Sequence, residues 1–344
     1  MKKRRVLLMV HEKLVPPEDV TGLSEEEVDA FRTEHNVYAT LCNIGHEVQI
    51  VGIGDRLSVL RHAVRNFKPH IVFNLLDEFS GIESYDHHVV GFLELIRQPY
   101  TGCNPRGMML SRDKVLTKQI LAWHRIQTPT FQLFPYGRKI SVSRKIRFPL
   151  FVKSATEDAS LGISQASIVD DMNSLRERIE FIHEHVQSDA LVEEYIDGRE
   201  LYIGVLGNSR LQTLPVWEMD FGTLQDRAAG IATRRVKWDR KYQDKHGITT
   251  GPALALGPEQ TRQLPRLAKR IFRALHMSGY ARLDLRMRPD GTVYLLEANA
   301  NPDLTFGEDF AESSAASGVD YPALLSRILS LGEGYWPEWR MFET

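Results

Sequence analysis

The chain has 344 residues, of which 42% are hydrophobic and 26% charged, a composition typical of globular proteins rather than of disordered or fibrous ones. Its formal net charge of −2 argues against nucleic acid or an acidic membrane as a partner. The two cysteines, Cys42 and Cys103, are too few for a disulfide framework, which favours a cytoplasmic setting. The length favours two or three subdomains.

The N-terminal part of the chain alternates strand and helix signals. The apolar run Arg5–Val10 is too short for the core of a signal peptide and predicts a first strand. The next predicted elements are a helix capped by Ser24, a strand at Gly45–Gly52, a helix at Leu57–Phe67 and a strand at His70–Leu76. This alternation predicts a parallel sheet that binds ligands beyond the carboxyl ends of its strands, where Asp77 and Glu78 follow the third strand.

The rest of the chain reads as an antiparallel α+β unit. A strand at Tyr100–Cys103 is followed by a linker with Pro105 and Gly107 and by a helix at Ser111–Trp123. The next predicted strands are Phe148–Lys153, Gly162–Ile168, Ala190–Ile196 and Leu201–Leu206, with one helix at Asn173–Val186. A helix at Pro258–His276 then precedes a hairpin of Ala281–Met287 and Thr292–Glu297, and the last predicted helix is Tyr321–Leu331.

The hairpin carries the most specific chemical pattern. Because side chains alternate along a strand, Asp284 on one strand and Glu297 and Asn299 on the other can share one face. Two carboxylates and an amide oxygen form a hard, all-oxygen set that suits Mg²⁺. The alternative is an exposed face with cross-strand charge pairs, but the neighbouring leucines indicate a buried sheet, where unpaired carboxylates are costly.

Two further segments suggest a nucleotide site. Lys153 lies on an apolar strand and precedes a small-residue loop that includes Ser160, an arrangement that suits a polyphosphate although it is not a Walker loop. In LVEEYIDGRELYIGVL, the polar connection between two strands can offer backbone groups to an adenine and a carboxylate to a ribose. An exposed lysine and an acidic hairpin loop are the alternative interpretations of these segments when each is taken alone.

In their order along the chain, these segments resemble the ATP-grasp superfamily, and most closely the D-alanine–D-alanine ligase group. The resemblance covers about residues 100–331 and rests on YTG, SRDKVLTK, FVKSATEDASLGIS, VEEYIDGRELYIGVL, KYQDKHGITTGPA, GYARLDLRMRPDGTVYLLEAN and the pair Asn301-Pro302. It implies an ATP-grasp fold of α/β plus α+β type, with a parallel-sheet domain at 1–104 and ATP-grasp subdomains at 105–189 and 190–344. It also implies an ATP-dependent ligase, and a homodimer through the first domain.

The resemblance assigns roles by position. The residues it places on ATP are Lys114, Lys153 and Ser160 at the phosphates, Glu193, Glu194 and Ile196 at the adenine, Glu200 at the ribose and Lys241 at the γ-phosphate. It makes Asp284, Glu297 and Asn299 the ligands of a pair of Mg²⁺ ions, for which Mn²⁺ can substitute. Arg282 would stabilise the tetrahedral intermediate, and the backbone N–H of Asp303 would face its oxyanion.

The substrate side departs from the pattern of the group. The segment MVHEKLVPPEDV lacks the Gly-Gly-x-Ser-x-Glu signature, whose glutamate helps to hold the first D-alanine, and Asp77-Glu78 replaces the expected histidine-glycine pair. The phosphate-loop serine reads Ala159, whereas its tyrosine partner is retained as Tyr242. The motif Pro-Gly-Met-Thr reads Pro302-Asp303-Leu304-Thr305, and the serine that binds the second carboxylate falls at Glu308.

These acidic replacements favour a ligase whose amine substrate is cationic, or at least is not plain D-alanine. The substrates would be small molecules or peptides that supply a carboxylate and an amine. D-alanine–D-alanine ligation in cell-wall synthesis is the leading alternative, and a carboxylase or a phosphotransferase is another. A non-catalytic nucleotide-binding module is disfavoured because the lysines, Arg282 and the three residues assigned to the metal are all retained.

Overall fold

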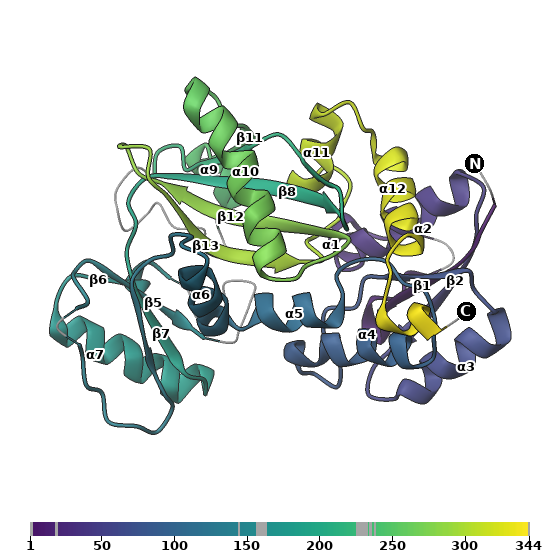
Figure 1. Cartoon of the computed structure of the whole chain (residues 1–344), viewed down its shortest axis with the longest axis horizontal. Helices are drawn as coiled ribbons and strands as arrows, with labels where there is room; N and C mark the ends of the chain where they lie inside the picture. The colour runs from purple at the N-terminus through teal and green to yellow at the C-terminus, as the bar shows by residue number, and fades with distance from the viewer. Residues whose placement is uncertain are drawn as a thin grey trace.

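The computed structural model describes residues 3–17, 20–143, 145–155, 164–224, 233, 236 and 239–342. These residues form a three-stranded, a four-stranded and a six-stranded sheet. In Figure 1 the three-stranded sheet lies at the right, the four-stranded sheet at the left, and the six-stranded sheet between and above them. The mixed α/β architecture agrees with the fold class predicted from the sequence.

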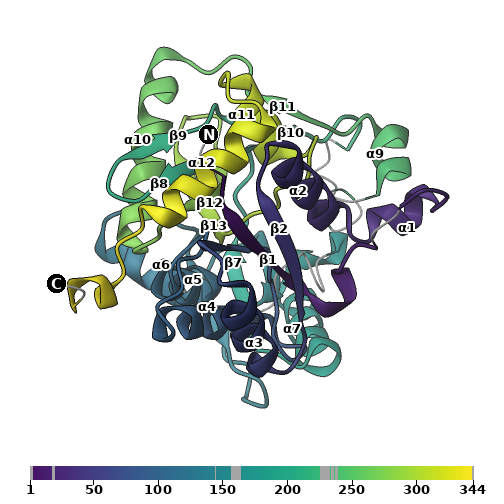
Figure 2. The same ribbon diagram turned by 90° about the vertical axis from the view of Figure 1, so that its right-hand side faces the viewer.

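The N-terminal sheet is parallel and covered on both faces. Its central strand β1 (Arg5–His11) pairs with β2 (Glu47–Ile53) and β3 (Ile71–Asn74). Because successive side chains of a strand point to opposite faces, Val6, Leu8 and Val10 pack into one core and Leu7 and Met9 into the other. Helices α2 (Arg32–Asn43) and α12 (Tyr321–Glu333) cover the first face, and α3 (Leu57–Phe67) and α4 (Asp86–Leu95) cover the second (Figure 2).

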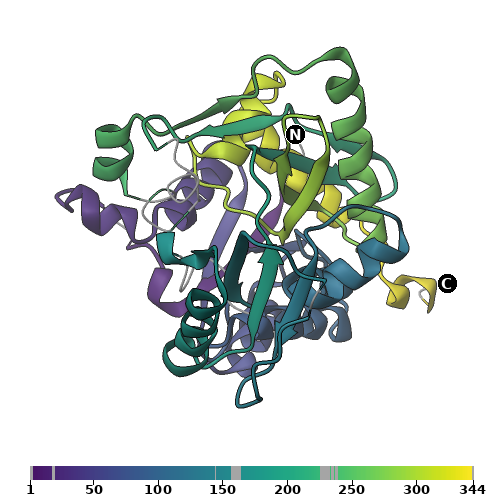
Figure 3. The ribbon, with the colours of Figure 1, turned by 90° about the vertical axis from the view of Figure 1, so that its left-hand side faces the viewer.

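The four-stranded sheet is antiparallel, in the order β4 (Phe131–Phe134), β7 (Ala190–Glu194), β5 (Leu150–Ser154) and β6 (Ile168–Val169). Helix α7 (Met172–Phe181) packs on it through Leu175 and Ile179 (Figure 3). Of the described part of the predicted strand Gly162–Ile168, only Ile168 lies in a strand, β6; the prediction is wrong at Gln165–Ser167, which form a 3₁₀ turn. The predicted helix Asn173–Val186 is α-helical only to Phe181 and ends as a π-helix, Ile182–Val186.

The six-stranded sheet has one apolar and one charged face. Its order is β11 (Thr249–Pro252), β10 (Trp217–Asp220), β8 (Arg199–Gly207), β12 (Tyr280–Met287) and β13 (Val293–Ala300), with β9 (Leu211–Thr213) paired to β8. Helix α10 (Pro258–Ala274) covers the apolar face, where its Leu264 and Phe272 belong to the same core as Leu283 and Leu295. The opposite face carries the acidic and basic side chains of β8, β12 and β13.

A β-bulge in the hairpin sets which residues of β13 reach each face. Asp284 pairs with Glu297 but the next residue, Leu285, pairs with Leu295, so Leu296 is the extra residue. The bulge lets Leu295 and Ala298 both enter the core although they are three positions apart. Glu297 and Asn299 therefore share the charged face with Asp284, as the sequence predicts.

The segment after β3 corrects two predictions. Tyr100 makes only an isolated parallel bridge to Val72, so no strand forms at Tyr100–Cys103. The predicted linker is helix α5 (Pro105–Arg112), in which Pro105 occupies the first turn, where a missing N–H costs nothing. Helix α6 (Lys114–Trp123) is separate from α5 because Asp113 leaves the helical conformation and caps the N–H of Leu116 at 2.8 Å.

The remaining helices among the described residues are short. They are α1 (Glu25–Asp29), α9 (Arg240–His246) and α11 (Asp309–Ala316), with 3₁₀ segments at Glu12–Leu14, Glu83–Tyr85 and Glu338–Phe342. Across the part of the chain that the structure describes, no helix combines the length and the apolar character that a membrane span requires.

Candidate active site

A buried cluster of lysines and one glutamate lies between α6 and the four-stranded sheet. The Nζ atom of Lys118 is 2.7 Å from one carboxylate oxygen of Glu193, and that of Lys153 is 3.3 Å from the other. Although burial alone would raise it, the two lysine charges hold the pKa of Glu193 below its ordinary value. Burial lowers the pKa of Lys118 against the pull of Glu193. The cluster thus buries two lysines against one shared carboxylate.

Helix α6 presents its two lysines to different sheets. Lys114 and Lys118 are four residues apart and therefore lie on one face of the helix. Lys118 reaches Glu193 on β7, whereas Lys114 Nζ is 3.1 Å from Glu297 on β13. Lys118 was not among the residues predicted for the site, whereas Lys114 was. The i+4 position of Lys118 on the same helix is the signal that could have identified it.

The hairpin brings Arg282, Asp284, Glu297 and Asn299 to adjoining positions. Arg282 pairs across the strands with Asn299, and Asp284 with Glu297. The Arg282 guanidinium also binds both oxygens of Asp284, Nε at 2.8 Å and Nη2 at 3.1 Å. Burial alone would lower the pKa of Arg282, but the charge of Asp284 raises this pKa above its ordinary value. In this structure each hairpin carboxylate thus has a basic side chain beside it: Arg282 at Asp284, and Lys114 at Glu297.

The hairpin side chains fit a hard divalent cation that binds together with phosphate oxygens. The amide Nδ2 of Asn299 is buried without a hydrogen-bond partner, so the described residues do not fix which way this amide points. The described residues contain no group of three or more His, Cys, Asp or Glu side chains that could hold a metal alone. Two carboxylates and one amide are the few protein oxygens that Mg²⁺ uses when a substrate phosphate supplies the rest.

The connection between β7 and β8 is tied to the end of β12. Arg288 binds Glu194 at 2.8 Å, and Arg286 binds Glu200 at 2.7 Å. A cavity of about 920 Å³ lies beside this connection and is lined by residues that include Tyr195, Gly198, Glu200, Phe221 and Arg286. Ile196 is buried in the same connection.

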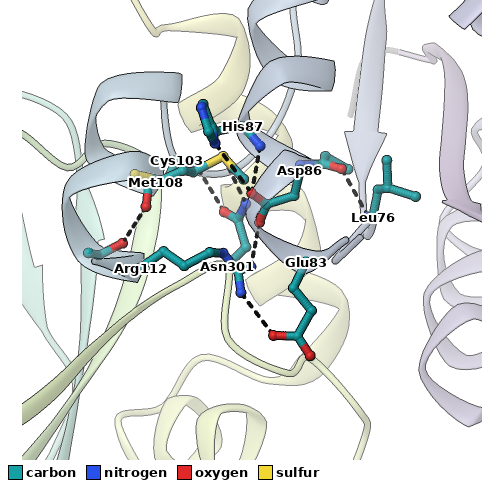
Figure 4. Close-up of polar contacts among 10 residues, drawn as sticks. Leu76, Glu83, Asp86, His87, Cys103, Met108, Arg112 and Asn301 are labelled. Carbon is teal, nitrogen blue, oxygen red and sulfur yellow. Dashed lines mark hydrogen bonds and ion pairs between the residues drawn. The ribbon is translucent and has the colours of Figure 1, made fainter. Parts of the chain in front are cut away.

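A second cavity, of about 550 Å³, lies at the carboxyl edge of the N-terminal sheet. Its two arginines are neutralised by neighbouring acids, Arg32 by Asp29 and Arg112 by Asp86 at 2.6 Å (Figure 4). The other acidic residues that line it are Glu34, Asp77, Asp303 and Glu308. Gln243, Asp303 and Glu308 also line an adjoining cavity that contains Arg282, Glu297 and Asn299. The acidic cavity therefore continues to the hairpin.

Glu34 is the most unusual group in the acidic cavity. Its residue is only 6% exposed, it lines the cavity, and no cation among the described residues pairs with it. Burial, reinforced by the negative charges of Asp77 and Asp303, raises the pKa of Glu34 to about 7. Glu34 was not predicted as a site residue, because the glutamate of the family signature directly follows the first strand, whereas Glu34 lies on α2.

The segment after β13 is held by contacts to the start of α5. The Asn301 side chain accepts a hydrogen bond from the Cys103 N–H at 2.7 Å and contacts the Met108 sulfur at 3.8 Å (Figure 4). Gly102 has a φ of +94°, and a Cβ there would lie 2.3 Å from the Asn301 Oδ1. The positive φ and the close approach of Asn301 both favour glycine at this position, which explains the glycine of the YTG motif. Beyond this tie, Asp303 accepts hydrogen bonds from Thr33 and Thr305 at the cavity wall.

Comparison with known proteins identifies the family of this chain. Residues 119–330 match the family model described as D-ala D-ala ligase C-terminus. The chain belongs to the D-alanine–D-alanine ligase family. The resemblance predicted from the sequence is thereby confirmed, and with it membership of a family of ATP-dependent ligases.

Relatives of this ligase include proteins of known and unknown activity. A D-alanine–D-alanine ligase of Desulfotalea psychrophila is 33% identical over 73% of this chain and 76% of its own length. An uncharacterized protein of Sinorhizobium fredii is 31% identical over 87% of each chain. The crystal structure of D-alanine–D-alanine ligase from Bacillus anthracis complexed with ATP shares the fold, with a TM-score of 0.73 at 22% identity over 96% of this chain and 97% of that one.

The structure leaves several predicted site residues of the ligase apart from these clusters. Lys241 is exposed on α9, and Tyr242 packs on the ring of His246, with 4.4 Å between the ring centroids. A carboxylate oxygen of Glu78 lies 3.0 Å from His11 Nε2, and Glu78 does not line the acidic cavity, whereas Asp77 does. Ser160, Ala159 and the rest of the predicted phosphate loop lie outside the described residues.

Proposed function

We propose that this ligase joins a carboxylate to an amine through an acyl phosphate, releasing ADP and phosphate, and that its amine substrate is cationic and is not plain D-alanine. Family membership supports the ATP-dependent ligation. The observation that carries the substrate proposal is the acidic cavity that continues to the hairpin, because its arginines are already neutralised and Glu34 and Asp77 have no cation partner among the described residues.

The nucleotide would lie between the four-stranded and six-stranded sheets. Lys114, which binds Glu297, and Lys118 and Lys153, which bind Glu193, would face the phosphates. Lys241 would approach them from α9. The lysine charges would offset the repulsion between triphosphate and carboxylate substrate. Asp284, Glu297 and Asn299 would hold Mg²⁺, which adds positive charge at the phosphates. Lys114 would then leave Glu297 for a phosphate oxygen, since the two cations would compete for one carboxylate.

The chemistry follows from activating a poor electrophile. A substrate carboxylate oxygen attacks the γ-phosphorus of ATP, the bond to the β-phosphate oxygen breaks, and ADP leaves. The amine nitrogen then attacks the acyl carbon, and phosphate leaves with the electron pair of the broken C–O bond. Arg282, beside Asp284 on the hairpin, would stabilise the developing oxyanion, together with the backbone N–H of Asp303.

The acidic cavity would bind the amine and take its proton. An attacking amine must be neutral at nitrogen, so a group with a pKa near 7 is suited to accept the proton at neutral pH. Glu34 has such a pKa and faces the cavity. Glu308 stands where a free α-carboxylate would otherwise be bound, and its charge would repel that carboxylate while attracting a second ammonium or a guanidinium.

Phosphate release from ATP tests this function. The protein is incubated with Mg²⁺, ATP and D-alanine, alone and with lysine, ornithine, arginine or a diamine, and products are identified by mass. We expect turnover to require a cationic amine. Rapid formation of the D-alanine dipeptide from D-alanine alone would refute the substrate proposal and favour the activity named for the relatives. Absence of ATP turnover with every substrate would favour a nucleotide-binding module.

Matched variants on one hairpin show whether the turnover belongs to this site. Glu297→Gln removes a charge from the predicted metal ligands and should lower turnover at least about a hundredfold. Asp290→Asn removes a charge from the exposed turn of the same hairpin and should leave turnover unchanged. Equal activity of the two variants would contradict the assignment of the hairpin as the catalytic site.

A further inference from the structure

Arg286 makes contacts that neither the family match nor the predicted ATP site accounts for. It lies on β12, two residues beyond Asp284, and is only 5% exposed. Its Nε and Nη2 donate to Oε2 of Glu200 at 3.1 and 2.7 Å. Its Nη1 faces the β7–β8 connection, 3.4 Å from the Tyr195 hydroxyl and 3.3 Å from the Gly198 carbonyl. One guanidinium thus spans a carboxylate and the connecting backbone.

This arrangement fixes the direction of the Glu200 carboxylate. Oε2 is held by two donors of Arg286, and Oε1 accepts a hydrogen bond from the Tyr202 hydroxyl at 2.8 Å. A buried carboxylate held from both sides keeps one orientation, because the arginine and the tyrosine each bind one of its oxygens. A carboxylate that is already oriented loses less conformational freedom when a hydroxyl group binds it.

The same guanidinium fixes the connection between the two ATP-facing sheets. Tyr195 to Gly198 link β7 of the four-stranded sheet to β8 of the six-stranded sheet. The Gly198 backbone packs so closely on β12 that a Cβ there would lie 2.1 Å from the Met287 carbonyl oxygen. Arg286 therefore acts where the chain crosses from one sheet to the other, beside the cavity of about 920 Å³.

We propose that Arg286 is a positioning residue for the nucleotide: it aims Glu200 at the ribose hydroxyls and holds the Tyr195–Gly198 backbone beside the base. This inference rests on the proposed ATP site. It assigns Arg286 no contact with the reacting atoms, so its loss acts on nucleotide affinity and on recognition of the ribose.

Arg288 provides a matched control. It lies two residues further along, carries the same charge and binds Glu194 at 2.8 Å at the start of the same connection. It has no contact with Glu200 in the described structure, and its side chain is about one-third exposed, at 32%. Replacing Arg288 removes a positive charge and the ion pair with Glu194, but leaves the contacts that orient Glu200 intact.

The experiment measures the affinity of the protein for ADP, 2′-deoxy-ADP and 3′-deoxy-ADP with Mg²⁺ by calorimetry. The wild type should prefer ADP over at least one deoxy form by about tenfold or more, the effect of a hydrogen bond to a charged group. Arg286→Met should weaken ADP binding about tenfold and bring the ADP-to-deoxy ratio close to one. Arg286→Lys should restore part of that ratio, and Arg288→Met should retain it.

The outcomes separate this inference from the function on which it rests. A wild type that does not bind ADP would overturn both. A wild type that binds ADP, with Arg286→Met showing an unchanged ratio, would overturn the positioning role alone, even if affinity for all three nucleotides falls together. If Arg286→Met does not fold, Arg286→Lys decides by the same ratio, since a lysine keeps the charge but cannot bind both Glu200 and the backbone.

Discussion

Replacing Glu34 by glutamine tests the electrostatics of the acidic cavity. Burial and the charges of Asp77 and Asp303 raise the pKa of this carboxyl from 4.5 to about 7. At about 1.36 kcal/mol per pH unit, ionising Glu34 costs the folded protein at most about 3.4 kcal/mol. Because the folded-state pKa lies above the unfolded value, the contribution of Glu34 to the free energy of unfolding is fully present below about pH 4.5 and is lost as the pH rises through about 7.

Urea unfolding of wild type and Glu34→Gln at about pH 5 and about pH 8 measures the effect. Glutamine cannot ionise, so the variant should exceed the wild type in free energy of unfolding by about 2–3 kcal/mol at the higher pH and by much less at the lower one. Glu47→Gln, at an exposed position that starts β2, is the control and should behave like the wild type at both. If the two proteins differ in free energy of unfolding by the same amount at both pH values, ionisation of Glu34 does not destabilise the folded protein and the prediction is refuted.

Glu193→Gln leaves the buried Lys118 and Lys153 without their counter-charge, so the free energy of unfolding, measured by urea denaturation, should fall by about 3–5 kcal/mol. A loss below about 1 kcal/mol would show that the charge of Glu193 does not stabilise the two lysines. Gly102→Ala and Gly137→Ala both place alanine at positive φ, but only the first meets a neighbour, Asn301, within contact distance. Thermal unfolding should therefore show about 1 kcal/mol lost at Gly137 and a clearly larger loss at Gly102; equal losses would contradict the close approach. Lys241→Ala, at an exposed position, should change stability by less than about 0.5 kcal/mol yet lower ATP turnover at least about a hundredfold, whereas unchanged turnover would remove Lys241 from the proposed site.

The hairpin was predictable because its signals are local. Side chains alternate along a strand whatever lies around it, so Asp284, Glu297 and Asn299 could be placed on one face from spacing alone. The helix Leu57–Phe67 was likewise predicted with its observed bounds. The bulge at Leu296 was not predicted, since it depends on how β12 and β13 pair rather than on the residues of either strand.

The contacts that complete the site are long-range and could not be read from the sequence. Lys118 becomes part of the lysine cluster only because the fold brings it to Glu193. Glu34 reaches the acidic cavity through the packing of α2 at the edge of the N-terminal sheet. Arg286 alternates with Arg282 and Asp284 along β12, but its partner Glu200 lies on the neighbouring strand β8, and strand order within a sheet is not visible in the spacing of residues.

The packing of α12 on the N-terminal sheet has a consequence for the synthesis of the chain. Strand β1 is synthesised well before α12, yet Val6, Leu8 and Val10 share a core with the residues of α12. Arg4, just before β1, is also tied to Glu333 at the end of α12 at 2.5 Å. The core on this face of the N-terminal sheet therefore cannot be completed before α12 has been synthesised, and until then part of the apolar surface of β1 lacks its partner.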